Sequence, residues 1–119
     1  MDVWGEDNFF YNLTLDSIVS YRYYFSVLER IRILVKRHRL LFSGKAAQQL
    51  LDGAWTVEDF IHSILHGRVV KRTKDESGVA RYKYVVVGPA IDGDPLYSCG
   101  KIVERGGQAY FVITFHEAR

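Results

Sequence analysis

Residues 55–67 read WTVEDFIHSILHG, and residues 68–73 continue with RVVKRT. Thr56 suits the N-cap of a helix, and Asp59, three positions later, can complete a capping box. Apolar residues then recur at helical spacing, and Gly67 is a typical helix end. The valines that follow are β-branched and stand among basic side chains, which favours a strand. The segment therefore predicts a helix that leads directly into a positively charged strand.

The residues before this segment show the period of helices. From Leu15 to about Arg39 the apolar residues form one stripe at helical spacing. The stripe consists of Leu15, Ile18, Tyr21, Phe25, Leu28, Ile31 and Val35. A short extended piece at Leu40–Phe42 leads to a second predicted helix at about Lys45–Leu51. We interpret the basic run Lys36–Arg39 as a solvated helix end that complements the helix dipole.

The residues after it show the period of strands. We predict strands at Arg81–Val87, Leu96–Glu104 and Gln108–His116, because β-branched and aromatic residues dominate them. Asp92-Gly93 and Arg105–Gly107 are the turns between them. The hydrophobic period thus changes near residue 68, which predicts an α+β fold. We expect two or three N-terminal helices on one face of a roughly four-stranded antiparallel sheet.

The last strand suggests which side chains form the core. Strict alternation places Phe111, Ile113 and Phe115 on one face, which we expect to pack against the helices. The other face would carry Tyr110, Val112, Thr114 and His116, and its polar half is where a site is expected. Residues predicted to be buried are Phe60, Ile64, Val86, Phe111, Ile113 and Phe115. Gly100, within its neighbouring strand, is expected to mark a bulge or a close approach.

Composition limits the class of protein. A chain of 119 residues suits one domain, and the net charge of +2 alone predicts no polyanion partner. The charge is clustered, however, at Lys36–Arg39 and again at Arg68, Lys71, Arg72 and Lys74. The single cysteine, Cys99, excludes a disulfide framework within one chain and fits a reducing cytoplasm. We expect a cytoplasmic protein, because no membrane-spanning stretch or secretory signal is evident.

The N-terminal region is unusually aromatic. Eight of the 17 aromatic residues fall within the first 25 positions. We therefore divide the chain into an aromatic extension with the start of a helix, residues 1–26, and an α+β domain, residues 27–119. One amphipathic helix cannot bury so many aromatic rings against a small sheet. We expect residues 1–25 to cover a hydrophobic surface, most simply across a homodimer.

Six short motifs follow one another in a recognisable order. They are Ser43-Gly44-Lys45-Ala46, Thr56-Val57-Glu58-Asp59, Gly67-Arg68-Val69, Tyr84-Val85-Val86-Val87-Gly88, Asp92-Gly93 and Ile113-Thr114-Phe115-His116. In this order and spacing, residues 28–119 resemble a family of small bacterial domains known as domain of unknown function 4258. That family in turn resembles RelE-type toxin ribonucleases, which cut RNA without a metal ion.

The resemblance implies a site on the polar face of the sheet. Cationic side chains would neutralise phosphate, and His116 would move protons. The catalytic residues expected in this way are His116, Lys45, Arg81 and Lys83. The substrate-binding residues expected are Arg72, Lys71 and Tyr84, and we expect no cofactor and no metal. The chain departs from the family pattern: Lys45 stands where a His is expected, Gln49 where an Arg is common, and His116 in place of a terminal Tyr.

Two hypotheses about function remain. The first is a toxin-like domain that binds RNA or cuts it without metal, with an antitoxin-like protein as a further partner. The alternative is a non-catalytic binding or assembly module with a degenerate active site, which the missing family His favours. His62 and His66 share a helix face at metal-ligand spacing, but no Glu completes a metalloprotease motif, so we predict no metal site there. No motif supports a small-ligand enzyme of another kind.

Overall fold

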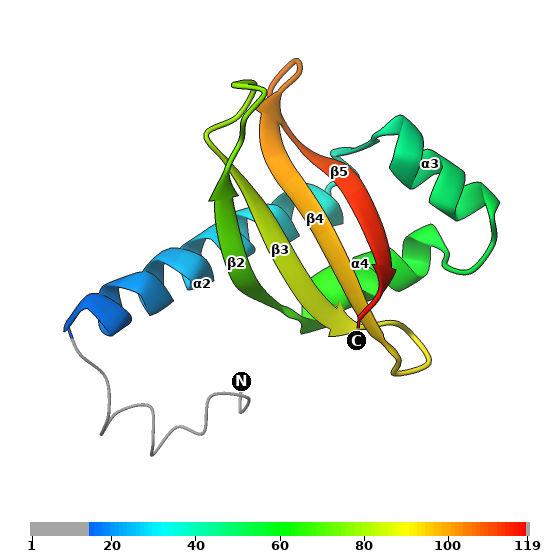
Figure 1. Ribbon diagram of the computed structural model, residues 1–119, viewed down its shortest axis with the longest axis horizontal. Helices are drawn as coiled ribbons and strands as arrows, with labels where there is room; N and C mark the ends of the chain where they lie inside the picture. Colours follow the sequence, from blue (N-terminus) through cyan, green and yellow to red (C-terminus); the bar gives the residue numbers. More distant parts are fainter. Residues whose placement is uncertain (1–14, 119) are drawn as a thin grey trace.

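The computed structural model of the chain describes the backbone of residues 15–118 and the side chains of residues 23–118. This part of the chain contains three helices and five strands, most of which are labelled in Figure 1. The helices are α2 (Leu15–Lys36), α3 (Gly44–Leu51) and α4 (Val57–His66). The strands are β1 (Leu40–Phe42), β2 (Arg68–Lys74), β3 (Tyr82–Pro89), β4 (Pro95–Glu104) and β5 (Gln108–Glu117). Within the described residues, none of the helices has the length and apolar character needed to span a membrane.

The strands form one mixed sheet in the order β1-β5-β4-β3-β2. Three of its four pairings are antiparallel, and β1 pairs with β5 in parallel. The predicted α+β class is confirmed, whereas the prediction of about four antiparallel strands is correct only in outline. The difference comes from Leu40–Phe42, the short extended piece, which joins the sheet as an edge strand.

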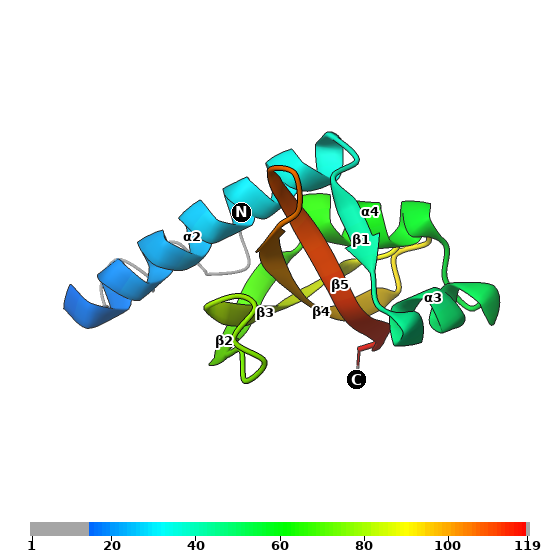
Figure 2. The ribbon, with the colours of Figure 1, turned by 90° about the horizontal axis from the view of Figure 1, so that it is seen from above.

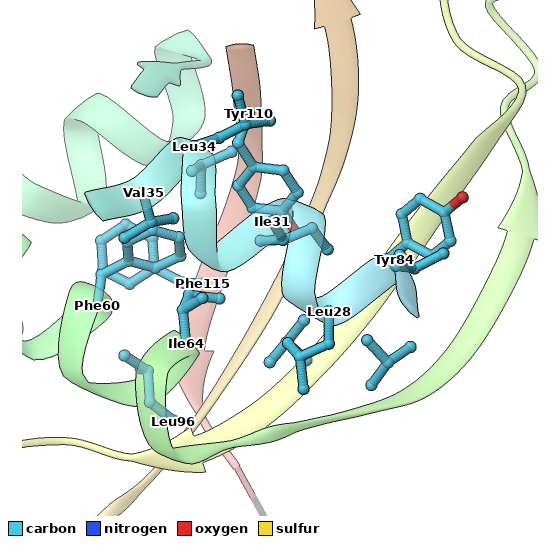
Figure 3. Packing of buried hydrophobic residues seen from close by; sticks show 14 of the residues in the cluster. Leu28, Ile31, Leu34, Val35, Phe60, Ile64, Tyr84, Leu96, Tyr110 and Phe115 are labelled. Atoms are coloured by element: carbon cyan, nitrogen blue, oxygen red, sulfur yellow. The ribbon is translucent and has the colours of Figure 1, made fainter. Parts of the chain in front are cut away.

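The helices and the sheet form two layers. In Figures 1 and 2, α2 and α4 lie against one face of the sheet, while α3 lies beside the β5 edge. The core fills the space between these helices and the sheet, as the side chains in Figure 3 show. Its largest fully buried members are Tyr110, Phe60, Phe115, Ile31, Ile64 and Leu96. We call the opposite face of the sheet the open face, and its side chains include Lys71, Lys83, Tyr97, Lys101 and His116.

A β-bulge in β5 overturns the predicted alternation of its side chains. Cys99 pairs with Thr114 and Gly100 pairs with Val112, so Ile113 is an extra residue without a partner on β4. A bulge of this kind shifts the alternation by one position. The alternation of faces therefore changes at Ile113. Phe111, Ile113 and Phe115 cannot all point to the same face of the sheet.

The core face of β5 consists of Tyr110, Val112 and Phe115, and all three are buried. The prediction that Phe111, Ile113 and Phe115 share the core face is thus wrong for the first two, which are half-buried. The predictions of burial for Phe60, Ile64, Val86 and Phe115 are confirmed.

The segment that decides the fold has the predicted local structure. The Thr56 hydroxyl accepts the N–H of Asp59, and the Asp59 carboxylate accepts the N–H of Thr56, which completes the capping box. The hydrogen bonds that the carboxylate accepts, chiefly the one from the Thr56 backbone N–H, lower the pKa of Asp59. Gly67 ends α4 in extended backbone, and a Cβ there would lie 2.4 Å from the Ser63 carbonyl oxygen. The glycine is needed for this close approach and not for a left-handed turn.

The basic run at the end of α2, Lys36–Arg39, includes residues with a structural role. His38 adopts a left-handed φ of 57°, and the N–H groups of His38 and Arg39 bond back to Val35 and Leu34 in a Schellman motif. The Arg39 guanidinium then donates to three carbonyl oxygens of the β4–β5 hairpin, at 2.8 to 3.2 Å. Interpreting Lys36–Arg39 as wholly solvated is therefore wrong for Arg39, which ties α2 to the hairpin.

The predicted interface of residues 1–25 lies almost entirely outside the residues whose side chains are described. Of the predicted α2 stripe, Leu28, Ile31 and Val35 are buried, whereas Phe25 is 48% exposed. The remaining stripe residues, Leu15, Ile18 and Tyr21, also lie outside the residues whose side chains are described.

Candidate functional site

The seven predicted site residues lie in four separate places. Neighbouring residues of one strand point to opposite faces, so Lys71 and Lys83 belong to the open face, and Arg72 and Tyr84 belong to the helix-covered face. Arg72 therefore lies on the opposite face of the sheet from Lys71 and Lys83. The bulge at Val70 contributes to this outcome, because it sets the register of Lys71 and Arg72 on β3.

Arg81 and His116 lie at opposite ends of the sheet. His116 pairs with Tyr97, and Tyr97 pairs with Val87 on β3. Arg81 precedes the first residue of β3, six positions before Val87. A strand rises about 3.3 Å per residue, so Arg81 and the β3 residue level with His116 are roughly 20 Å apart along the strand. The side chains of Arg81 and His116 therefore do not meet around one phosphate group.

His116 is exposed and packs on its cross-strand neighbour. Its ring stacks on Tyr97 with the centroids 4.7 Å apart and an interplanar angle of 16°. Its Nδ1 lies 2.9 Å from the Glu117 carbonyl oxygen. Lys83, on the open face, lies four positions along β3 from the residue that pairs with Tyr97, which is roughly 13 Å.

Lys45 is exposed in the first turn of α3. The start of this helix is fixed by Ser43, whose hydroxyl accepts the Ala46 N–H and donates to the Ile113 carbonyl oxygen. Gln49 bonds through its amide to the Thr114 hydroxyl and the Phe115 N–H. Gln49 is therefore a structural link between α3 and β5.

A pocket of about 490 Å³ lies where α2 passes the end of the sheet that carries the β2–β3 loop and the β4–β5 hairpin. This end is at the top of Figure 1. The polar side chains that line it are Tyr23, Arg30, Arg72, Arg81, Tyr82 and Tyr84, together with Glu104 and Gln108. We call it the arginine–tyrosine pocket. Three of the predicted site residues are here: Arg72, Arg81 and Tyr84.

Aromatic rings from two elements hold the guanidinium of Arg72. Its Cζ lies 4.5 Å from the ring centre of Tyr23 on α2 and 4.3 Å from that of Tyr82 on β3. A side-chain hydrogen bond with Tyr23 also raises the pKa of Arg72. Stacking uses the faces of a guanidinium and leaves N–H donors along its edge. Arg72 is thus a fixed cation at the wall of the pocket.

Tyr84 forms part of the floor of the pocket. Its hydroxyl is 2.9 Å from that of Tyr23, so the two tyrosines connect α2 to β3. Burial is the main cause that raises the pKa of Tyr84, and the hydrogen bond with Tyr23 acts in the same direction. Tyr84 therefore stays neutral at physiological pH and can act here as a hydrogen-bonding and packing group, not as a base.

The loop that carries Arg81 is anchored from the open face. The Asp75 carboxylate accepts the N–H of Ala80 and the ammonium of Lys101, at 2.9 and 3.1 Å. Ser77 donates its hydroxyl to the same carboxylate. These bonds, led by that from Ala80, hold the pKa of Asp75 well below its usual range. These bonds therefore hold in place the backbone next to Arg81, which lines the pocket.

The pocket carries a concentrated positive charge. Arg30, Arg72 and Arg81 line it, and Glu104 is the one acidic side chain among the lining residues. None of these three arginines forms an ion pair with a described residue. Guanidinium groups beside tyrosine rings suit a ligand with phosphate groups and flat bases, because they offer hydrogen-bond donors next to stacking surfaces.

A second pocket, of about 550 Å³, lies at the opposite end of β2. Its wall is mainly apolar and backbone, with Arg32, His66 and Arg68 as the basic side chains. Arg32 is already engaged, since it donates to the carbonyl oxygens of Ile64 and Gly67 at the end of α4. This pocket therefore has fewer available donors for phosphate than the arginine–tyrosine pocket.

His62 and His66 do not form a metal site with other side chains. Their rings are 4.2 Å apart, and each Nδ1 lies close to a backbone carbonyl oxygen. Among the residues that the structure describes, no group of three or more His, Cys, Asp or Glu side chains is arranged to hold a metal ion.

The sequence alone does not place Tyr23, Arg30 or Tyr82 in the site, and Tyr23 falls within the expected interface of residues 1–25. The signal that indicates Tyr23 and Arg30 is their spacing, seven residues or about two turns apart on one side of α2. Only the tertiary structure shows that this side faces β2 and β3.

No family model matches the chain, and no curated protein or solved structure matches it at a significant level. The resemblance to domain of unknown function 4258 and to RelE-type ribonucleases therefore stays a prediction from the motifs.

Proposed function

We propose that this protein binds single-stranded RNA in the arginine–tyrosine pocket. The observation that carries the proposal is the placement of Arg72 against the rings of Tyr23 and Tyr82, with Arg30 and Arg81 lining the same cavity. The choice of RNA over other polyanions rests on the motif resemblance described above.

The chemistry of the pocket supports recognition of a phosphate group with a neighbouring base. Arginine binds phosphate through parallel N–H donors, and the stacking of Arg72 on Tyr82 holds its guanidinium plane in place. Such pre-ordering lowers the entropy that is lost when a ligand binds. Tyrosine rings beside a cationic groove stack on bases with little preference for sequence.

The shape of the pocket supports a single strand over a duplex. The cavity of about 490 Å³ is lined on one side by residues of α2 and on the other by residues at the end of the sheet. A base can enter it only if it is unstacked from its neighbours, which single strands and loops allow and a continuous duplex does not.

The motif resemblance also implies that the bound RNA is cut without a metal ion and that an antitoxin-like protein binds this chain. Both remain part of the proposal. The residues expected to perform acid–base chemistry, His116 and Lys45, do not line the arginine–tyrosine pocket. Binding without cleavage is the activity that the geometry supports best, and the non-catalytic assembly module is the alternative.

The test compares neighbouring cations that point to opposite faces of the sheet. Fluorescence anisotropy with a labelled twelve-nucleotide RNA of mixed sequence, at low salt, measures binding by the wild type and by four variants. Arg72→Ala and Arg81→Ala are expected to weaken binding roughly tenfold each, as expected for loss of a charged hydrogen bond. Lys71→Ala and Lys83→Ala remove the same charge from the open face, and we expect changes of less than about twofold.

Circular dichroism and thermal unfolding show whether each variant is folded before binding is compared. Weaker binding of Lys71→Ala and Lys83→Ala, with no effect of the arginine changes, would move the site to the open face and contradict the pocket. Equal affinity for the strand and for a duplex of the same sequence would also contradict it. If the wild type does not bind the RNA at low salt, the assembly module becomes the better hypothesis.

A further inference from the structure

We propose that the RNA strand leaves the arginine–tyrosine pocket past Arg30 and continues along α2 to Arg37, so that the protein requires a ligand of several nucleotides. This inference rests on the proposed function and adds the path and the minimum length of the ligand. It comes from a second cavity, of about 450 Å³, next to the first.

The two cavities share part of their walls. Arg30 and Gln108 line both of them, so one cavity begins where the other ends. The second cavity is completed by Ile33, Leu34 and Arg37 of α2 and by Arg39. A chain that passes Arg30 therefore enters the second cavity without crossing the body of the protein.

Helix geometry aligns the side chains that face this path. Arg30, Ile33 and Arg37 are spaced at i, i+3 and i+7, which places them on one side of α2. Arg30 and Arg37 are about 10 Å apart along the axis, at a rise of 1.5 Å per residue. Two arginines at this spacing face successive parts of an extended strand, and a single phosphate cannot occupy both.

The chemistry along the path matches a phosphate backbone with bases between the phosphates. Arg30 and Arg37 are exposed, and neither forms an ion pair with any residue from 23 to 118. Ile33 between them is 48% exposed, which is unusual for a large apolar side chain and offers a surface for a base. Arg39 is committed to the hairpin carbonyl oxygens and forms a fixed wall of the path.

The chain supplies a matched control beside Arg37. Lys36 is also an exposed cation in the last turn of α2, but it lines neither cavity. Replacing either residue with alanine removes one positive charge from the same helix turn. A difference between Arg37→Ala and Lys36→Ala therefore reports the path and not the total charge.

The experiment measures the affinity of the full chain for two RNAs at several salt concentrations. One is the labelled twelve-nucleotide RNA, and the other is an unlabelled trinucleotide that competes with it. Arg37→Ala is expected to weaken binding of the long RNA by roughly threefold to tenfold and to reduce the slope of log K against log salt by about 0.7, the loss of one phosphate contact. The same variant is expected to leave the affinity for the trinucleotide unchanged, and Lys36→Ala is expected to change neither.

Each other result counts against the path. If Arg37→Ala binds the long RNA as the wild type does, or if Lys36→Ala weakens binding equally, the path along α2 is wrong while the pocket stands. Equal losses of affinity for both RNAs would also overturn it, because Arg37 would then act within the first cavity or through the fold. Failure of the wild type to bind either RNA would instead overturn the proposed function.

Discussion

Asp75 and Lys101, 26 residues apart, form a buried ion pair that joins the β2–β3 loop to the middle of β4. The carboxylate and ammonium are 3.1 Å apart, and their side chains are 3% and 10% exposed. The Lys101 ammonium also lies 5.7 Å from the centre of the Phe111 ring. The pair closes the loop onto the open face and thereby holds the residues that lead into Arg81.

The first prediction concerns the loss of this pair. Lys101→Met keeps most of the volume of the side chain but leaves the Asp75 carboxylate without its cation. Because an unpaired buried charge is costly, we expect the melting temperature to fall by roughly 5 °C or more. The double variant Asp75→Asn with Lys101→Met removes both charges, and we expect it to regain part of the loss. Equal melting temperatures of the wild type and Lys101→Met would contradict a stabilising ion pair.

The second prediction is a dependence of stability on pH. The pKa of Asp75 is lowered in the folded protein, so the unfolded chain binds its proton at higher pH than the folded chain does. The stabilisation is therefore complete above the unfolded pKa of about 3.9 and is lost as the pH falls below it. Thermal unfolding between pH 5 and pH 2 measures this loss, and Asp75→Asn is expected to make the curve less steep over that range.

The third prediction concerns Gly100. A Cβ at this position would lie 2.4 Å from Cζ of Tyr110, whose ring is fully buried and cannot move aside. Gly100→Ala is therefore expected to destabilise the protein by about 2 kcal/mol or more. Gly44→Ala is the control, because a Cβ at Gly44 meets no atom within 4 Å. Chemical denaturation of both variants checks the difference.

The fourth prediction separates two buried tyrosines. The hydroxyl of Tyr110 is buried without a hydrogen-bond partner among the described residues, whereas that of Tyr84 bonds to Tyr23. Tyr110→Phe removes an unsatisfied polar group, so we expect unchanged or higher stability in denaturation experiments. Tyr84→Phe breaks a satisfied bond and is expected to cost about 1 kcal/mol. A larger loss for Tyr110→Phe than for Tyr84→Phe would show that the Tyr110 hydroxyl is satisfied in solution.

Local sequence rules predicted the helices and strands well because their signals are local. The capping box of Thr56 and Asp59, the glycine after α4 and the turns of the last hairpin each act over a few residues. The long-range parallel pairing of Leu40–Phe42 with β5 has no such signal, since it depends on where α2 ends and how the chain returns to the sheet. The mixed sheet was therefore beyond these rules.

The bulges explain why the site was only partly predictable. One extra residue at Ile113 changes which side chains of β5 enter the core, and another at Val70 fixes the faces of Lys71 and Arg72. Strict alternation contains no information on such insertions. The motif resemblance makes Arg72, Arg81 and Tyr84 candidates, but Tyr23, which lies beside Arg72, comes from a helix about 50 residues earlier in the chain.

The last prediction tests which part of the molecule acts on RNA. From the sequence, His116 is expected to act as an acid–base group, so that His116→Ala lowers any cleavage roughly a hundredfold. In the folded protein, however, its level in the sheet is roughly 20 Å along β3 from that of Arg81, too far to reach a phosphate held in the pocket. We therefore expect His116→Ala to leave the affinity for the twelve-nucleotide RNA within about twofold of the wild type, because it removes no cation from the pocket.

Gel electrophoresis of the same RNA after long incubation with a chelator measures cleavage alongside anisotropy. If RNA is cut by the wild type, we expect Arg72→Ala and Arg81→Ala to reduce cleavage and His116→Ala to preserve it, since the scissile phosphate would be bound at the pocket. The opposite pattern, with cleavage lost in His116→Ala and kept in Arg72→Ala, would place the chemistry at the Tyr97–His116 end of the open face. The pocket would then be a binding surface only, separate from the catalytic centre.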